Sequence, residues 1–106
     1  MSPVYTEQIG RTEAHETRLT RAFTGRAGRS IRTRFVDAAA AEGAPSSAPY
    51  PVQRGLTRLM REAAVQAGDA ERMQMWAGQA ARMAVAEPAA EIAQKLWDQA
   101  KDLLGN

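Results

Sequence analysis

Apolar residues recur at helical spacing through the second half of this 106-residue chain. Three stripes with a period close to 3.6 predict helices over residues 51–67, 69–84 and 88–104. The main stripe members are Val52, Leu56, Leu59, Met60, Met73, Trp76, Met83, Ile92, Leu96 and Leu103. Pro51 suits a first helical turn, and Gly68 suits a helix end. The pattern indicates a mainly helical chain.

The first half of the chain is patterned less clearly. Residues 1–16 are polar, and we expect a loop or a short frayed helix there, as a lead-in to the rest. Over residues 17–23, Leu19, Arg21 and Phe23 alternate with Arg18, Thr20 and Ala22, which predicts a short strand. A helix is predicted over 30–41 with Ser30 as its N-cap. The proline- and serine-rich stretch 42–50 is predicted to be a loop. The whole is an alanine-rich piece of three to four helices with a short strand near its start.

Composition limits the chemistry. The absence of cysteine excludes disulfides, thiolate metal sites and cysteine catalysis. The single histidine, His15, lies in a polar stretch, and no spacing of His, Asp and Glu suggests a metal site. No apolar run approaches the 18 or so residues of a membrane span, and no signal peptide is recognisable. We therefore expect a cytoplasmic protein that is not bound to a membrane and carries no metal.

The charge is unevenly distributed. The net charge is only +2, but residues 18–34 contain six arginines and no acid. They are Arg18, Arg21, Arg26, Arg29, Arg32 and Arg34. Such a patch can attract phosphate or nucleic acid, or it can be a solvated face or pair with acids elsewhere in a larger protein. Because no recognisable nucleic-acid motif accompanies it, nucleic-acid binding is the less favoured interpretation.

Two segments carry side chains suited to a flat ligand. Tyr50 stands between two prolines in the segment APYPVQ, so its backbone is restricted and its ring is held in place. In the segment WAGQ, Trp76 can line a flat ligand while the amide of Gln79 offers hydrogen bonds. The alternatives are a packed loop tyrosine and a core tryptophan, and residue physics alone favours these.

Taken in order, several segments of the chain match one family. They are Thr20–Arg26, Arg29, Ile31, Arg34–Phe35, Ala48–Gln53, Leu56–Thr57, Ala67–Asp69, Trp76–Gln79 and Pro88–Glu91. Together they make the chain, over roughly 17–104, resemble the C-terminal part of the nitronate monooxygenases, formerly called 2-nitropropane dioxygenases. The chain departs from the family pattern at Ala27 and Gly28, where Pro-Ala is usual, and at Thr33, where asparagine is usual. Loss of that proline predicts a more mobile turn.

The resemblance implies a fold and an activity. Members of the family are FMN-dependent enzymes with a TIM barrel and a smaller helical domain, and they oxidise alkyl nitronates with oxygen to a carbonyl compound and nitrite. Residues 17–106 would then be a C-terminal segment of such an enzyme, supplying the last barrel elements and part of the helical domain. The family's FMN phosphate site and its catalytic histidine precede this portion. His15 does not match that histidine, so we expect no catalytic residue here.

The same resemblance makes Tyr50, Trp76 and Gln79 the best candidates to face the flavin or the substrate. It also implies that the chain alone binds no FMN and is inactive, as a fragment or a subunit. The apolar stripes would then meet a barrel-completing partner chain or favour self-association. The alternative is a small basic helical module that binds nucleic acid or a protein partner through residues 18–34. That alternative gives the APYPVQ and WAGQ segments no purpose.

Overall fold

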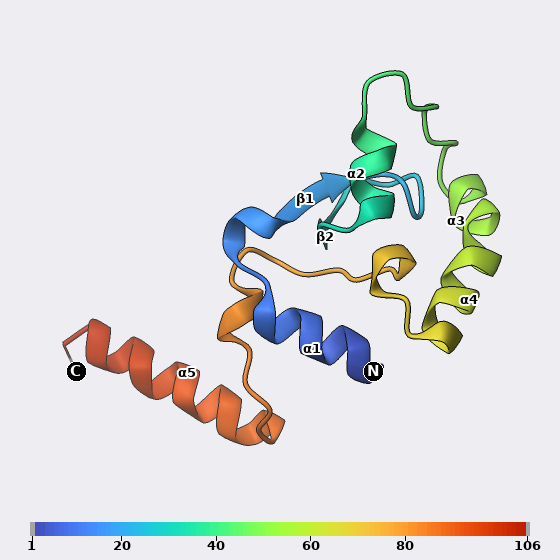
Figure 1. Cartoon of the computed structure of the whole chain (residues 1–106). Helices are drawn as coiled ribbons and strands as arrows, with labels where there is room; N and C mark the ends of the chain where they lie inside the picture. Colours follow the sequence, from blue (N-terminus) through green and yellow to red (C-terminus); the bar gives the residue numbers. More distant parts are fainter. Residues whose placement is uncertain (1, 106) are drawn as a thin grey trace.

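A short antiparallel hairpin with helices around it forms the main body of the computed structural model, which describes residues 2–105 (Figure 1). The described α-helices and strands are α1 (Pro3–Arg11), β1 (Thr17–Thr20), β2 (Gly28–Ile31), α2 (Arg34–Ala40), α3 (Val52–Leu56), α4 (Arg58–Ala67) and α5 (Ala89–Leu103). Short 3₁₀ helices lie at Ala14–Glu16, Ala70–Arg72 and Ala81–Met83. The mainly helical fold with a strand near its start is confirmed.

The polar first stretch contains a helix that packs on the body of the protein. Pro3 occupies the first turn of α1, where its missing N–H costs nothing. Val4, Tyr5 and Ile9 follow helical spacing and pack against the core. Residues 2–16 are therefore attached to the rest of the fold through an amphipathic helix.

The two strands of the hairpin pair from Thr17 opposite Ile31 to Thr20 opposite Gly28. The far edge of β2 is also paired: Ser30 forms an antiparallel bridge with Trp76, and the Ile31 N–H donates to the Met75 carbonyl at 3.0 Å. Partners on both edges keep residues 28–31 extended.

The expected N-cap role of Ser30, and the helix start at residue 30, are wrong. Ser30 is fully buried in β2, and its hydroxyl donates to the Met75 carbonyl at 3.1 Å. The helix α2 begins instead at Arg34, after Thr33, whose hydroxyl accepts a hydrogen bond from the Val36 N–H. The capping chemistry is the expected one, moved three residues along the chain.

The helix predicted over 51–67 is divided in two at Thr57. Thr57 is buried, and its hydroxyl donates to the Phe23 carbonyl at 2.7 Å. This bond attaches the junction of α3 and α4 to the hairpin turn. Gly68 ends α4 in the left-handed conformation, with φ of 64°, as its glycine identity favours.

The helix predicted over 69–84 is wrong. Asp69 does act as a cap, accepting from the Glu71 N–H, but only for one 3₁₀ turn. Met73 and Met75 lie on an extended segment, and both are 1% exposed. Trp76, which follows Met75, pairs with β2. Alternate burial is the signature of extended chain, and pairing with a strand distant in sequence outweighs a helix-like apolar spacing.

The core lies between the hairpin, the segment 73–77 and helices α1 and α4. Its cluster of buried residues consists of Ile31, Ala64, Met73 and Met75. A second buried contact centres on Phe23, which is completely buried. The Phe23 ring lies 5.0 Å from that of Phe35 and 5.8 Å from that of Trp76, measured between centroids. Aromatic pairs at such distances add to the stabilisation from burial.

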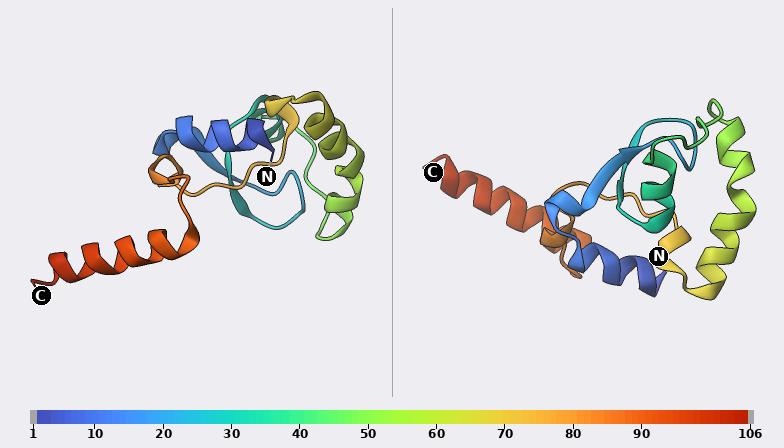
Figure 2. Two further views of the ribbon diagram at one scale, coloured as in Figure 1. Left: turned by 90° about the horizontal axis from the view of Figure 1, so that it is seen from below. Right: turned by 45° about the horizontal axis from the view of Figure 1, so that its top comes forward.

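Helix α5 extends away from the other elements in all views (Figures 1 and 2). It coincides with the helix predicted over 88–104. Leu96, Trp97 and Leu103 are exposed on it, Leu103 by 89%. Its apolar face is therefore largely uncovered, although Ile92 and Leu96 line a hollow together with Met83 and Val85. No helix among residues 2–105 has the length and apolar character needed to cross a membrane.

Candidate functional site

The turn between β1 and β2 is built for close approach by another backbone. Gly25 has φ of 95°, a conformation that glycine adopts freely. A Cβ on Gly25 would lie 2.5 Å from the Tyr50 backbone nitrogen and 2.7 Å from the Ala48 oxygen. The Arg21 guanidinium donates to the Gly25 carbonyl at 3.2 Å and closes the turn. Glycine at this position allows the loop 42–50 to lie directly on the hairpin turn.

Tyr50 ends that loop, and its ring is partly covered. The Arg26 guanidinium lies 4.2 Å from the centre of the Tyr50 ring, within the range of a cation–π contact. The side chain remains 44% exposed, and the Tyr50–Pro51 peptide bond is cis. The ring is thus held from one side by the hairpin turn and is open to solvent on the other.

Trp76 contacts the same hairpin from the segment that pairs with β2. A Cβ on Gly28 would lie 2.9 Å from the Cζ3 atom of the indole, so this glycine also permits close approach. The indole meets the buried Phe23 edge-on and is 36% exposed. The Tyr5 hydroxyl donates to the Trp76 carbonyl, and burial raises the pKa of Tyr5, an effect that this hydrogen bond partly offsets. Trp76 is therefore not the core residue of a helical stripe.

Gln79 is not brought to this position by any contact. It is exposed in the turn that leads into the 3₁₀ helix Ala81–Met83, and its amide has no hydrogen-bond partner within residues 2–105. The structure thus brings two of the three sequence-predicted candidates, Tyr50 and Trp76, to one hairpin turn, and leaves Gln79 in solvent.

Residues that join these segments escaped the sequence analysis as site residues. Gln53 receives a hydrogen bond from the Ala48 N–H at 3.0 Å and donates one to the Ala22 carbonyl at 2.7 Å. Gln53, Gly25 and Arg26 all belong to the segments that carry the family resemblance. Their place in those segments was the available signal, but their contacts with the loop 42–50 and the hairpin turn depend on the fold.

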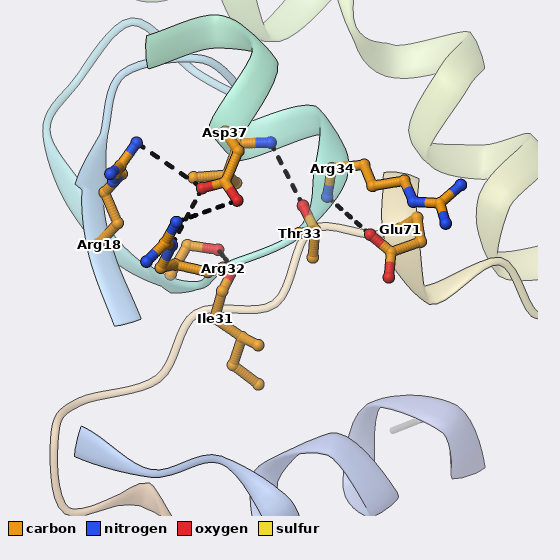
Figure 3. Close-up of polar contacts among 9 residues, drawn as sticks. Arg18, Ile31, Arg32, Thr33, Arg34, Asp37 and Glu71 are labelled. Carbon is orange, nitrogen blue, oxygen red and sulfur yellow. Dashed lines mark hydrogen bonds and ion pairs between the residues drawn. The ribbon is translucent and has the colours of Figure 1, made fainter. Parts of the chain in front are cut away.

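The hairpin is joined to α2 and to the turn at 70–72 by polar contacts among Arg18, Arg32, Arg34, Asp37 and Glu71, here called the polar clasp (Figure 3). Asp37 forms ion pairs with Arg32 at 3.0 Å and Arg18 at 3.6 Å. The hydrogen bond from Arg32 lowers the pKa of Asp37, partial burial opposes this, and the charges of Arg32 and Arg18 add to the lowering. The Arg34 backbone N–H donates to the Glu71 carboxylate at 2.6 Å.

This clasp changes the interpretation of the arginine-rich stretch. Two of its six arginines, Arg18 and Arg32, share the carboxylate of Asp37. Arg29 donates to the Thr17 hydroxyl at 3.1 Å, and Arg26 lies over Tyr50. The stretch therefore takes part in internal contacts of the fold, among them ion pairs with an acid of the same chain.

Two surface hollows lie beside the hairpin turn and beside α4. One, of about 310 Å³, is lined by residues including Leu19, Ala22 and Ala39, and another, of about 370 Å³, by residues including Arg61 and Gln74. Neither is lined by Tyr50, Trp76 or Gln79. Within residues 2–105 no group of three or more His, Cys, Asp or Glu side chains is arranged to hold a metal ion.

Comparison with known proteins identifies the class of protein. The family model described as nitronate monooxygenase matches residues 1–99. The chain therefore belongs to the nitronate monooxygenase family, a family of oxidoreductases. The match includes residues 1–16, which the sequence analysis left outside the resemblance.

Particular relatives agree with this assignment. Over 104 residues, 97% of this chain, it is 33% identical to a probable nitronate monooxygenase of Staphylococcus aureus strain Newman, and equally to that of strain JH9. A solved structure, of the nitroalkane oxidase from Streptomyces ansochromogenes, is similar with a TM-score of 0.76 and 38% identity over 89% of this chain. The chain spans 29% of the curated relatives and 26% of the solved chain, and it corresponds to their C-terminal part.

Proposed function

We propose that this chain supplies the C-terminal part of an FMN-dependent nitronate monooxygenase, which oxidises alkyl nitronates with oxygen to a carbonyl compound and nitrite. Family membership supports the class of enzyme. The observation that carries the proposal is the meeting of three family-like segments on one hairpin turn. Phe23 and Gly25 lie at the centre, Tyr50 contacts Gly25, and Trp76 contacts Phe23.

In this proposal Tyr50 and Trp76 face the flavin or the substrate, with Gln79 as a third candidate. Both aromatic side chains are fixed on one side by the hairpin and open on the other. An aromatic surface held in this way suits contact with a flat ring. We assign none of the three a catalytic step, and His15, which is exposed, is not a candidate base.

We propose that the described residues do not by themselves form an FMN site. A cofactor site encloses most of its ligand, and a phosphate is typically held by backbone N–H groups at a helix N-terminus. Neither Tyr50 nor Trp76 lines the hollow beside Ala22 or the hollow beside Arg61. Bound flavin supplies the redox chemistry in enzymes of this kind. We propose that the TIM barrel that holds the FMN and the catalytic base belongs to the rest of the enzyme, acting in the cytoplasm.

The uncovered side of α5 supports a contact with that remainder. Leu96, Trp97 and Leu103 expose apolar surface on a helix that touches little else. Exposed apolar patches of this kind mark interaction surfaces. We propose that this face covers the barrel, present either as a partner chain or as part of a longer polypeptide.

A chimaera tests the proposal. This chain would replace the matching C-terminal part of the Streptomyces ansochromogenes nitroalkane oxidase, and that enzyme truncated at the same point would be the control. We expect the chimaera to be yellow and to consume oxygen with an alkyl nitronate, whereas the truncated enzyme and the 106-residue chain, each with added FMN, should not. A chimaera that is monodisperse and helical by circular dichroism, yet inactive, would refute the proposal.

The alternative of a basic interaction module has less support. Its binding surface would need free arginines between residues 18 and 34, and Arg18 and Arg32 are paired with Asp37. Salt-dependent binding of a duplex oligonucleotide by the isolated chain would favour it.

A further inference from the structure

Two loops of the protein are joined by the side chain of Gln53, the second residue of α3. Its Oε1 accepts from the Ala48 N–H at 3.0 Å, and its Nε2 donates to the Ala22 carbonyl at 2.7 Å. The donor at one end and the acceptor at the other fix the orientation of the amide, because reversing it would set oxygen against oxygen. One side chain thus holds both the loop before Tyr50 and the start of the hairpin turn.

The surroundings of this bridge leave little freedom between the two loops. The Gly25 backbone lies against the backbone of Ala48 and Tyr50, with no space for a Cβ. Four residues beyond Gln53, the Thr57 hydroxyl donates to the Phe23 carbonyl at 2.7 Å. Successive residues of the turn, Ala22 and Phe23, are therefore each held by a side chain from the α3–α4 region.

The contact between Tyr50 and Arg26 depends on the arrangement of the two loops that Gln53 joins. Tyr50 lies two residues after Ala48, and Arg26 lies on the hairpin turn, so their contact at 4.2 Å needs both segments in one arrangement. Tyr50 is 44% exposed, and therefore packing around its ring is incomplete. The hydrogen bonding of the loop that carries the ring is therefore a further constraint on it.

We infer that Gln53 is a positioning residue for Tyr50. Its amide joins the Ala48 N–H to the Ala22 carbonyl, which holds the Tyr50 ring under the Arg26 guanidinium and presents its open face in one orientation. The inference rests on the proposed function for its purpose, since Tyr50 is there the side chain that faces the flavin or the nitronate. The placement of the ring by Gln53 can be tested without flavin.

The test uses nuclear magnetic resonance on the 106-residue chain. Only two tyrosines are present, so labelled Tyr50 and Tyr5 give two separable sets of ring signals. The Tyr50 ring should shift the Arg26 Hδ protons upfield. In Gln53→Met, which keeps the length of the side chain but removes both hydrogen bonds, we expect loss of most of that shift and a move of the Tyr50 signals. The exposed Gln66 on α4 gives the matched control, Gln66→Met, in which both stay as in the parent.

Two internal references separate positioning from general loosening. Tyr5 and the methyl groups of the buried Met73 and Met75 report on the core and should be unchanged in Gln53→Met. If the Tyr50 and Arg26 signals also stay unchanged, the inference is wrong.

A second variant decides the matter even if Gln53→Met disturbs the core. In Gln53→Glu the carboxylate still accepts from Ala48 but sets an oxygen against the Ala22 carbonyl, so the Arg26 shift should be small near pH 7. Protonation supplies a donor again, so the shift should return as the pH falls through the pKa of the new carboxyl group. A merely structural role predicts no such recovery, and its absence would overturn the inference.

The chimaera separates this inference from the proposed function. If Gln53→Met and Tyr50→Ala each raise KM for the nitronate several-fold and the double variant is no worse than Tyr50→Ala, both stand. If Tyr50→Ala leaves the kinetics unchanged while Gln53→Met still releases the ring, the role of Tyr50 in the proposed function fails and the positioning by Gln53 holds. If the ring does not move in the isolated chain, the positioning fails whatever the kinetics.

Discussion

Replacing Gly25 with alanine should destabilise the protein through two separable effects. The residue has φ of 95°, and a left-handed backbone costs a non-glycine residue roughly 1–2 kcal/mol. The new methyl group would also lie 2.5 Å from the Tyr50 nitrogen and 2.8 Å from the Pro49 carbonyl carbon. These are backbone atoms and yield only if the loop moves, which costs about 1–3 kcal/mol as overpacking.

The sum can be compared with the stability of the whole domain. Alanine has less conformational freedom than glycine in the unfolded chain, and this offsets about 0.4–1 kcal/mol of the destabilisation. The net loss for Gly25→Ala is then about 1–5 kcal/mol, a substantial part of the roughly 5–15 kcal/mol typical of a domain. Urea unfolding, followed by the helix signal in circular dichroism at about 222 nm, measures this difference as a shift of the midpoint at constant m-value.

Gly43 provides the matched control. It has a similar φ, 81°, but a Cβ there would meet no atom within 4 Å. Gly43→Ala therefore carries the backbone strain without the steric contact. We expect Gly25→Ala to lose about 1–3 kcal/mol more than Gly43→Ala, the steric part alone. Equal losses for the two variants would refute the reasoning that the loop lies directly on the hairpin turn.

Three further outcomes follow from particular contacts. Thr57→Val leaves the Phe23 carbonyl without its donor and should lower the free energy of unfolding by about 1–3 kcal/mol in urea; no change would show that water replaces the hydroxyl. Arg32 lowers the pKa of Asp37, so the ion pair stabilises the folded protein by roughly 0.2–1 kcal/mol above about pH 5, and this stabilisation is lost as the pH falls from about 4 through the folded pKa. Asp37→Asn should therefore reduce the loss of thermal stability at acid pH, and an unchanged dependence on pH would contradict this. The isolated chain should associate with rising concentration in sedimentation velocity, and Leu96→Glu should reduce this; a parent chain that is monomeric throughout would show that the exposed face of α5 is tolerated in water.

Local pattern and capping residues were sufficient where a segment's structure depends on its own neighbours. The stripe of α5 and the glycine that ends α4 are of this kind, and both elements lie where the sequence places them. The helix predicted over 69–84 was wrong because Met73, Trp76 and Ala77 fit a helical stripe as well as an extended segment. Their conformation is decided by β2, 45 residues earlier at the Ser30–Met75 contact, and no local window contains that partner.

The candidate site was predictable in its members more than in its arrangement. Proline on both sides of Tyr50 marked it as a fixed aromatic, and the structure holds its ring against Arg26. Trp76 was noticed for its neighbours in WAGQ, but its contact with Phe23 arises from the bridge to β2. The two hydrogen bonds of Gln53 join residues 5 and 31 positions away, and the longer one could not be read from local spacing.

The pairing of β2 with the segment around Met75 also sets the timing of folding during synthesis. Ser30 is made 45 residues before its partner, and at roughly 5–20 residues per second that separation corresponds to about 2–9 s. For that interval the nascent hairpin carries an unpaired strand edge, the kind of template on which chains aggregate. Slowing the ribosome lengthens the time for which the edge is exposed. A chaperone that covers the edge should therefore improve the yield on overexpression more than a low translation rate does.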